Sequence, residues 1–169
     1  MTSRKTFQHP DTPSPVLILH DIRSVINVGA LFRTADAIGI KTIILSGVTP
    51  GPNDRFGRKR SDFAKAALGA EDFVSYIQVE NIVPFIKSLK KEGFLICAIE
   101  QSKKSLDYKS FTAKKDQKIA IIPGNEVDGV PKNILSLADT ILELPMKGKK
   151  ESLNVSVATG IILYHLLDK

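Results

Sequence analysis

The sequence predicts one α/β domain whose mainly parallel β-sheet is flanked by helices on both faces. Short apolar segments rich in β-branched residues alternate with segments in which apolar residues recur at helical spacing, a pattern typical of parallel α/β proteins. The chain has 169 residues, 43% of them apolar, which is enough for one hydrophobic core but short for two. We therefore predict a flexible N-terminal arm at 1–15, which holds three prolines, and a single domain at 16–169.

The expected elements alternate from residue 16 onward. Apolar runs predict strands at 16–20, 42–46, 73–77, 94–99, 119–123 and 140–144. Helical spacing predicts helices at 28–38, closed by Gly39, and at 61–68, 81–91, 131–138 and 153–167. The stretch 47–60, rich in glycine and proline, predicts a loop. The lysine-rich stretch 103–118 predicts a solvated connection, because no apolar stripe accompanies its charges.

Bulk properties narrow the range of functions. Lys and Arg number 24 against 18 Asp and Glu, a net charge of +6 that weakly favours polyanionic partners. The single cysteine, Cys97, lies in an apolar run, so we expect a small buried core residue and no internal disulfide. No stretch has the apolar length of a signal peptide or a membrane span, and we therefore expect a cytoplasmic protein with no membrane contact.

Three polar segments stand next to expected strand ends, where open α/β sheets bind their ligands. They are HDIRSVINVGALFRTA at 20–35, IIPGNEVDGVP at 121–131 and LPMKGKKESLNVSVA at 144–158. In the second segment, Gly124 allows a ligand to approach the backbone closely. In the third, small polar residues interleave with apolar ones, which is a poor start for an amphipathic helix and favours a bound ligand.

Each segment also has a purely structural interpretation. Asn27 suits a helix cap, and Arg33 can pair with a carboxylate three residues on. The second segment reads as a tight acidic turn that caps the next helix. Ser152 or Asn154 suits the N-cap of the last helix.

Together the three segments resemble the three motifs of the SpoU, or TrmH-type, branch of the SPOUT RNA methyltransferases. The matching residues stand in the family's order: Asn27-Val28-Gly29-Ala30 with Arg33-Thr34-Ala35, then Gly124-Asn125-Glu126 with Gly129, then Pro145-Met146 and the run from Ser152 to Ala158. Ala67-Leu68-Gly69-Ala70-Glu71 is similar to the family's middle segment. The resemblance covers the chain after the arm, so 16–169 is expected to be a SpoU methyltransferase domain.

The resemblance implies an α/β knot, in which the C-terminal part forms a trefoil, against the general rule that chains are unknotted. It implies S-adenosylmethionine as cofactor, held around Ile122, Gly124, Leu144, Met146, Leu153 and Ala158. It also implies a homodimer through the knot and the last helix. No metal is expected, and the sequence offers no cluster of metal ligands.

The implied reaction moves the cofactor's methyl group to a ribose 2'-hydroxyl of tRNA or rRNA. That hydroxyl is a poor nucleophile until its proton is removed or hydrogen-bonded away. The resemblance assigns this activation to Arg33, support of the site to Asn27 and Glu126, and contacts near the reacting groups to Ser152 and Asn154. An arginine guanidinium keeps its proton up to about pH 12, so the destination of the proton stays open.

Basic residues supply the expected RNA contacts. The loop 47–60 surrounds Phe56 with Arg55, Arg58, Lys59 and Arg60, which suits phosphate binding with a base stacked on the ring. A solubilising surface loop is the alternative. Further candidates are Lys147, Lys149 and Lys150 before the third motif, and Arg4 and Lys5 on the arm. Several family members carry an added RNA-binding domain where this sequence shows only a short arm, so we expect core loops or a partner to select the RNA.

Two other classes of function stay open. The main alternative is a non-catalytic RNA-binding protein that retains the methyltransferase fold, although the polar motif residues are all present. An α/β enzyme for a small nucleotide-like substrate has less support, because no G-x-G-x-x-G follows the first strand and no P-loop lysine motif occurs.

Overall fold

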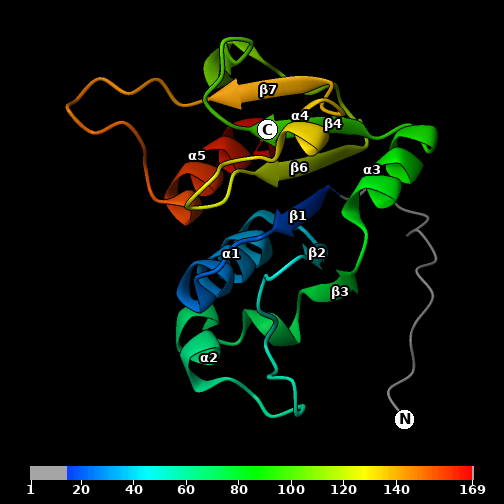
Figure 1. The fold of residues 1–169 in the computed structure, drawn as a ribbon, viewed down its shortest axis with the longest axis vertical. Helices are drawn as coiled ribbons and strands as arrows, with labels where there is room; N and C mark the ends of the chain where they lie inside the picture. Colours follow the sequence, from blue (N-terminus) through cyan, green and yellow to red (C-terminus); the bar gives the residue numbers. More distant parts are fainter. Residues whose placement is uncertain (1–14, 169) are drawn as a thin grey trace.

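Parallel strands form the centre of the computed structural model, which describes residues 15–168 (Figure 1). The strands pair in the order β3-β2-β1-β6-β4-β7-β5, and each of these pairings is parallel. They are β1 (Val16–His20), β2 (Thr42–Ser46), β3 (Ser75–Val79), β4 (Leu95–Ile99), β5 (Leu106–Asp107), β6 (Ile119–Pro123) and β7 (Thr140–Glu143). The predicted parallel α/β sheet is confirmed. Residues 1–14, which include Arg4 and Lys5, lie outside the described range.

Helices cover both faces of the sheet (Figure 1). They are α1 (Val25–Ile38), α2 (Ser61–Ala67), α3 (Ile82–Lys91), α4 (Lys132–Leu135) and α5 (Val155–Leu167), with short 3-10 turns at Ala70–Asp72 and Tyr108–Ser110. Leu17 and Leu19 belong to the core that α1, α2 and α5 cover, whereas Val16 and Ile18 face α3 and α4. Because both faces are buried, β1 is apolar throughout rather than alternating. Within the described range no helix is long and apolar enough to cross a bilayer.

Cys97 confirms its expected role as a core residue. It lies fully buried in β4, on the face covered by α1 and α5. Burial raises the pKa of its thiol to about 12, because the thiolate would lose its hydration. The residue is therefore a small hydrophobe and not a nucleophile.

Several element boundaries differ from the predictions. Helix α1 begins at Val25, because the hydroxyl of Ser24 accepts the N–H of Asn27 (3.2 Å) and caps it; the alternative role of Asn27 as cap was wrong. Helix α4 is shorter than the predicted 131–138. The strand predicted at 73–77 begins only at Ser75, because a 3-10 turn precedes it and leaves Phe73 75% exposed.

The segment 103–118 is not simply the solvated connection that its lysines predict. Leu106–Asp107 adds a short edge strand to β7, and Tyr108 and Phe111 pack against the core beside α5. The ring of Tyr108 also lies edge-on to that of His165, whose Nε2 is 2.9 Å from the carbonyl oxygen of Phe111. Most of the segment is exposed, as predicted, and its few packed apolar side chains were missed because they are scattered and form no periodic stripe.

The strand order separates segments that are neighbours in sequence. Strand β7 lies between β4 and β5, although β5 directly follows β4 along the chain. From β1 the chain adds β2 and β3 on one side, and it continues on the other side with β6 and β4. The junction between β1 and β6 is therefore the switch point of the sheet, where the carboxyl ends of the strands leave a crevice for ligands.

Helices α1 and α2 approach each other closely at Gly29. A Cβ atom placed there would lie 2.7 Å from the Cβ of Ala66 and 2.9 Å from the carbonyl oxygen of Phe63. The rings of Phe32 and Phe63 pack edge to face one turn further on, with centroids 5.1 Å apart. Gly29 is therefore required by helix packing, whatever its place in a motif.

We predict that Gly29→Ala destabilises the protein, although glycine-to-alanine changes inside helices are normally stabilising. The added methyl group pushes α1 away from α2, which lowers the free energy of unfolding by about 1–3 kcal/mol. For a domain of this size that corresponds to a loss in Tm of about 2–12 °C. Gly148→Ala is the matched control, because nothing lies within 4 Å of a Cβ there. Thermal unfolding followed by circular dichroism gives both values, and an unchanged or raised Tm for Gly29→Ala contradicts the packing argument.

Candidate functional site

The carboxyl ends of β4, β6 and β7 open into a cavity of about 500 Å³. It lies beside the switch point between β1 and β6. Its lining comes from 99–101 after β4, from 123–129 after β6, and from 143–159, which runs from the end of β7 into the first turns of α5. The second and third polar segments of the sequence therefore form its walls.

Side chains from all three polar segments join in one hydrogen-bonded chain beside the cavity. The amide nitrogen of Asn27 donates to Glu126 Oε1 (2.9 Å), and the amide nitrogen of Asn154 donates to Asn27 Oδ1 (3.1 Å). An ionised carboxylate only accepts, so the Glu126 end of the chain fixes the orientation of both amides. Asn27 thus bonds to Glu126, which is 99 positions away in the sequence, and to Asn154, which is 127 positions away.

Glu126 also caps the strand-to-helix turn that begins α1. Its carboxylate accepts the backbone N–H groups of Arg23 (3.1 Å) and Ser24 (3.3 Å). Burial acts to raise the pKa of Glu126, but donation by Asn27 and these N–H groups outweighs it and holds the pKa below its usual value. The carboxylate therefore stays ionised at neutral pH.

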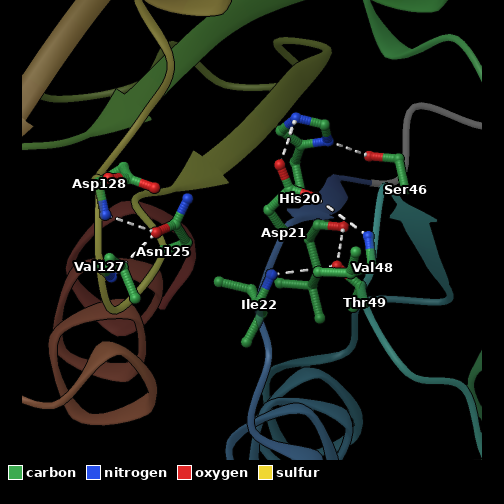
Figure 2. A network of polar contacts seen from close by, with 10 residues as sticks. His20, Asp21, Ile22, Ser46, Val48, Thr49, Asn125, Val127 and Asp128 are labelled. Carbon is green, nitrogen blue, oxygen red and sulfur yellow. Dashed lines mark hydrogen bonds and ion pairs between the residues drawn. The ribbon is translucent and has the colours of Figure 1, made fainter.

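The second segment is a tight turn, as its structural interpretation predicts, but it does not cap the next helix. Asn125 Oδ1 accepts the N–H groups of Val127 (2.9 Å) and Asp128 (2.8 Å), as Figure 2 shows. The N-cap of α4 is Pro131, without a side-chain hydrogen bond. The turn instead directs Glu126 toward α1.

Asn154 is the N-cap that its structural interpretation predicts, and it also makes a contact that the sequence did not predict. Its Oδ1 accepts the N–H groups of Ser156 (2.9 Å) and Val157 (3.4 Å), which makes it the N-cap of α5. Its amide nitrogen is left to bond Asn27. One side chain therefore fixes the start of α5 relative to the start of α1.

Most of the residues predicted to be catalytic or to hold the cofactor come together at the cavity. Its lining includes Gly124, Leu144, Met146, Leu153 and Ala158 from the predicted cofactor set, and Glu126, Ser152 and Asn154 from the predicted catalytic set. Ile122 is not in the lining, because it is buried in β6 on the face covered by α3 and α4.

Glu100 is a residue of the cavity that the sequence analysis missed. It follows β4 directly, and its Oε2 accepts the N–H of Val130 (2.7 Å). Its signal, an acidic residue at the end of an apolar run, was the one used for the other segments. With Glu126 and Glu143 it makes three carboxylates in the lining, which in the described range includes no Lys, Arg or His. The cavity therefore favours a cationic ligand.

Arg33 lies away from the cavity of its own chain. It is exposed on α1 and borders a small hollow that also includes Ala66 and Tyr164. Exposed or half-buried residues with helical spacing continue this surface, which we call the α1/α5 face: Ile26, Ala30, Arg33 and Ala37 on α1, and Val157, Ile161 and Tyr164 on α5. Among these residues only Arg33 and the Tyr164 hydroxyl are polar, and the hydroxyl of the adjoining Thr34 donates to the carbonyl of Ala30.

A polar network fixes the loop between β1 and α1 to the end of β2 (Figure 2). His20 Nδ1 is 2.8 Å from Ser46 Oγ, and His20 Nε2 is 3.3 Å from Asp21 Oδ2. Asp21 has a left-handed backbone (φ 55) and accepts the N–H of Val48 (3.0 Å). Thr49 links the same two loops through the N–H of Ile22 (3.2 Å). This network holds the loop that leads to Asn27.

The basic loop 47–60 is closed and internally bonded. Asn53 and Lys59 form a bridge across it, and Asp54 accepts the N–H groups of Phe56 and Arg58. Phe56 is 68% exposed, with the guanidiniums of Arg55 and Arg58 4.7 and 5.2 Å from its ring centroid. Asp54 also pairs with the Arg58 guanidinium (2.8 Å), and Lys59 lies 3.7 Å from Asp72, so Arg55 is the least engaged of these three cations.

The three lysines predicted before the third motif lie next to the cavity lining. Lys147, Lys149 and Lys150 are exposed on the connection between the lining residues Met146 and Ser152. Within 15–168 no group of His, Cys, Asp and Glu side chains is arranged to hold a metal ion.

Fold and site define a parallel α/β domain with an acidic cavity at the carboxyl edge of its sheet, lined by the second and third polar segments and joined to the first through Asn27. Comparison with known proteins extends this. The family model of the SpoU rRNA methylases matches residues 14–164. The chain belongs to this family, as its motifs predict.

Individual relatives agree. A Staphylococcus aureus protein assigned to the TrmH family of tRNA/rRNA methyltransferases is 33% identical over 156 residues, 92% of this chain and 59% of its own length. The 23S rRNA (guanosine-2'-O-)-methyltransferase RlmB of Neisseria meningitidis is 34% identical over 89% of this chain and 57% of its own. This chain thus spans less than two thirds of these relatives.

Solved structures show the same fold. The AdoMet-bound rRNA methyltransferase of Sinorhizobium meliloti superposes with a TM-score of 0.82 at 28% identity, over 94% of this chain and 57% of that one. The TrmH/SpoU tRNA modifying enzyme of A. aeolicus gives a TM-score of 0.78 at 28% identity, over 91% of this chain and 74% of its own.

We predict that Glu126→Gln lowers the Tm at neutral pH and that the difference from wild type shrinks in acid. The folded pKa of Glu126 lies below the usual value of 4.5, so its stabilisation is fully present above that pH and is lost as the pH falls through the folded pKa. Thermal unfolding between pH 7 and pH 3 tests this. Asp128→Asn, which removes a charge from the same turn, is the control, and a difference that grows in acid contradicts the prediction.

Proposed function

We propose that this domain transfers the methyl group of S-adenosylmethionine to a ribose 2'-hydroxyl of tRNA or rRNA. The observation that carries the proposal is the Glu126–Asn27–Asn154 chain, which joins the three family motifs beside one acidic cavity. The 2'-hydroxyl as acceptor is supported by the 34% identity to a guanosine-2'-O-methyltransferase. RNA as substrate, which the relatives' names support, implies a cytoplasmic protein.

The cavity fits the proposed cofactor. Its volume of about 500 Å³ lies in the usual range for nucleoside-sized ligands. Its carboxylates and the absence of basic residues from the described lining suit a ligand with sulfonium and ammonium groups. Gly124 offers bare backbone at the cavity wall, where an adenine ring can approach. When bound, S-adenosylmethionine supplies an electrophilic methyl carbon on a positively charged sulfur.

The residues of the chain position and activate the acceptor. Ser152 and Asn154 lie in the lining at the exposed start of α5, where they can hydrogen-bond the ribose. Asn27 holds α1 in register with both cavity walls through its bonds to Glu126 and Asn154. The activating group is Arg33, whose guanidinium donates hydrogen bonds to the 2'-oxygen and to a neighbouring phosphate, so that it stabilises the oxyanion that forms as the hydroxyl proton passes to water.

Arg33 reaches a cavity if two copies of the chain pair. We propose a homodimer through the α1/α5 face, an apolar surface of the kind that marks protein interfaces. Leu153 lines the cavity and Val157 lies one turn further on this face, so the cavity and the face adjoin. In a two-fold dimer the Arg33 of one protomer then completes the cavity of the other.

The proposal includes the trefoil knot. The connection 100–118 runs from β4 past β7 to β5 and returns to β6. It contacts α5 through Tyr108 and Phe111, and Gln101 bonds the carbonyl of Glu151 (2.8 Å). These contacts join the connection 100–118 both to α5 and to the segment before α5. They are expected if the C-terminal segment passes through the loop that this connection forms.

RNA contacts are proposed at two places. The exposed ring of Phe56, flanked by Arg55 and Arg58, suits an unpaired base next to backbone phosphates, and Lys59 and Arg60 extend that loop. Lys147, Lys149 and Lys150 lie on the connection beside the cavity, where phosphates flanking the target ribose would be held.

The direct test is transfer of label from S-adenosylmethionine to unmodified bulk tRNA or rRNA. We expect label in alkali-resistant dinucleotides with the wild-type protein and a loss of at least about 100-fold with Arg33→Ala, because one donor to a developing oxyanion is worth about that much. Cofactor affinity, measured by calorimetry, should stay within a few-fold in this variant. Cofactor binding without transfer to any RNA assigns the protein to the non-catalytic class instead.

A mixing experiment tests whether Arg33 acts across the dimer. Arg33→Ala and Met146→Arg, which blocks the cavity with a cation, should each be inactive alone. After the subunits exchange at random, about half of the two-fold dimers are mixed and each has one complete site, so about a quarter of wild-type activity should return. No recovery, in a sample whose mixed dimers are verified by differential tags, would falsify the proposed trans arrangement.

A further inference from the structure

The carboxylate of Glu100 fills the space behind the second motif. Oε2 accepts the N–H of Val130 (2.7 Å), and Oε1 accepts the N–H of Gln101 (2.8 Å). Val130 is buried, so its N–H has no access to water as an alternative partner. Glu100 therefore fastens the end of the motif turn to the end of β4.

The same carboxylate explains the two glycines of that turn. A Cβ atom at Gly129 would lie 2.0 Å from Glu100 Oε2, and all three of its nearest neighbours would be Glu100 atoms. A Cβ atom at Gly124 would lie 2.7 Å from the same oxygen. Gly129 is further constrained by its left-handed backbone (φ 69). The glycines at both ends of the turn thus leave room for one side chain.

The turn that Glu100 fastens forms a wall of the proposed cofactor cavity. Gly124, Asn125, Glu126, Val127 and Gly129 all line it. The pairing of Asn125 N–H with the Gly129 carbonyl (3.1 Å) closes the turn directly above Glu100. A shift of this turn changes the shape of the cavity and also moves Glu126 away from Asn27.

We propose that Glu100 is a positioning residue that sets the cofactor-binding turn 124–129, acting through Gly124, Gly129 and Val130. The inference rests on the proposed binding of S-adenosylmethionine. In this role Glu100 fixes the position of the turn through the oxygen that accepts the Val130 N–H, and cofactor affinity depends on that hydrogen bond more than on the negative charge.

Calorimetric titration with S-adenosylmethionine separates these roles. We expect Glu100→Ala to weaken affinity by about tenfold or more, since it removes the acceptor of the Val130 N–H and releases the turn. Glu100→Gln keeps one oxygen for Val130 and should stay within about threefold of wild type. In transfer assays the KM for the cofactor should rise in Glu100→Ala by a larger factor than kcat falls, because the turn lines the cavity directly and reaches Asn27 only through Glu126. Asp128→Asn controls for loss of charge from this turn.

The outcomes distinguish this inference from the proposed function. If the wild-type protein does not bind S-adenosylmethionine, the proposed function fails. If the wild type binds and Glu100→Ala binds equally well, the positioning role is overturned. Equal losses in Glu100→Ala and Glu100→Gln overturn it too, because they indicate a direct charge contact with the cofactor.

A stability cycle tests the steric part without any ligand. Gly129→Ala should lower the Tm of the wild-type protein, because its methyl group displaces the Glu100 carboxylate from the Val130 N–H and the left-handed backbone is strained for alanine. In the Glu100→Ala background the same change should cost less than half as many degrees, since only the strain of the left-handed backbone remains. Equal losses in both backgrounds overturn the assignment of Glu100 as the reason for the glycine.

Discussion

The side-chain amide of Asn27 is the contact on which the site depends, because within residues 15–168 it alone bonds to both other motifs. Its nitrogen and oxygen are both used, one toward Glu126 and one toward Asn154. Glu126 in turn satisfies N–H groups at the start of α1, and Asn154 satisfies those at the start of α5. The beginnings of two helices and the end of one strand are thereby fixed to each other through neutral amides around a single carboxylate.

Strand order explains why such distant residues meet. The ends of β1, β6, β4 and β7 lie next to one another in the sheet, although their positions in the chain span most of its length. Each loop that leaves this edge contributes polar groups to a neighbour: Glu126 to α1, Glu100 to the turn after β6, and Asp21 to the loop after β2. The site is consequently built from loops that also brace each other.

Local sequence determined much of the fold, and long-range pairing determined the rest. Apolar runs and helical spacing located most strands and helices because burial on both faces leaves a strong pattern, whereas β5 is two residues long and leaves none. The motif resemblance predicted that Glu126, Ser152 and Asn154 lie near one another, and they line one cavity. It did not predict that Arg33 lies outside this cavity, because that depends on which side of α1 faces solvent. Glu100 was missed because its partners are backbone N–H groups and glycines, whose need for it becomes visible only in three dimensions.

The insertion of β7 between β4 and β5 has a consequence for synthesis of the chain. Strands β1, β2 and β3 pair with near neighbours, so their half of the sheet can assemble while the ribosome is still translating the remainder. Strand β5 has no partner until β7 emerges, and the packing of α5 on α1 follows later still. The ligand cavity, whose walls extend to residue 159, therefore forms only after the start of α5 has emerged, and a nascent chain cannot bind a ligand there before residues 143–159 have been synthesised.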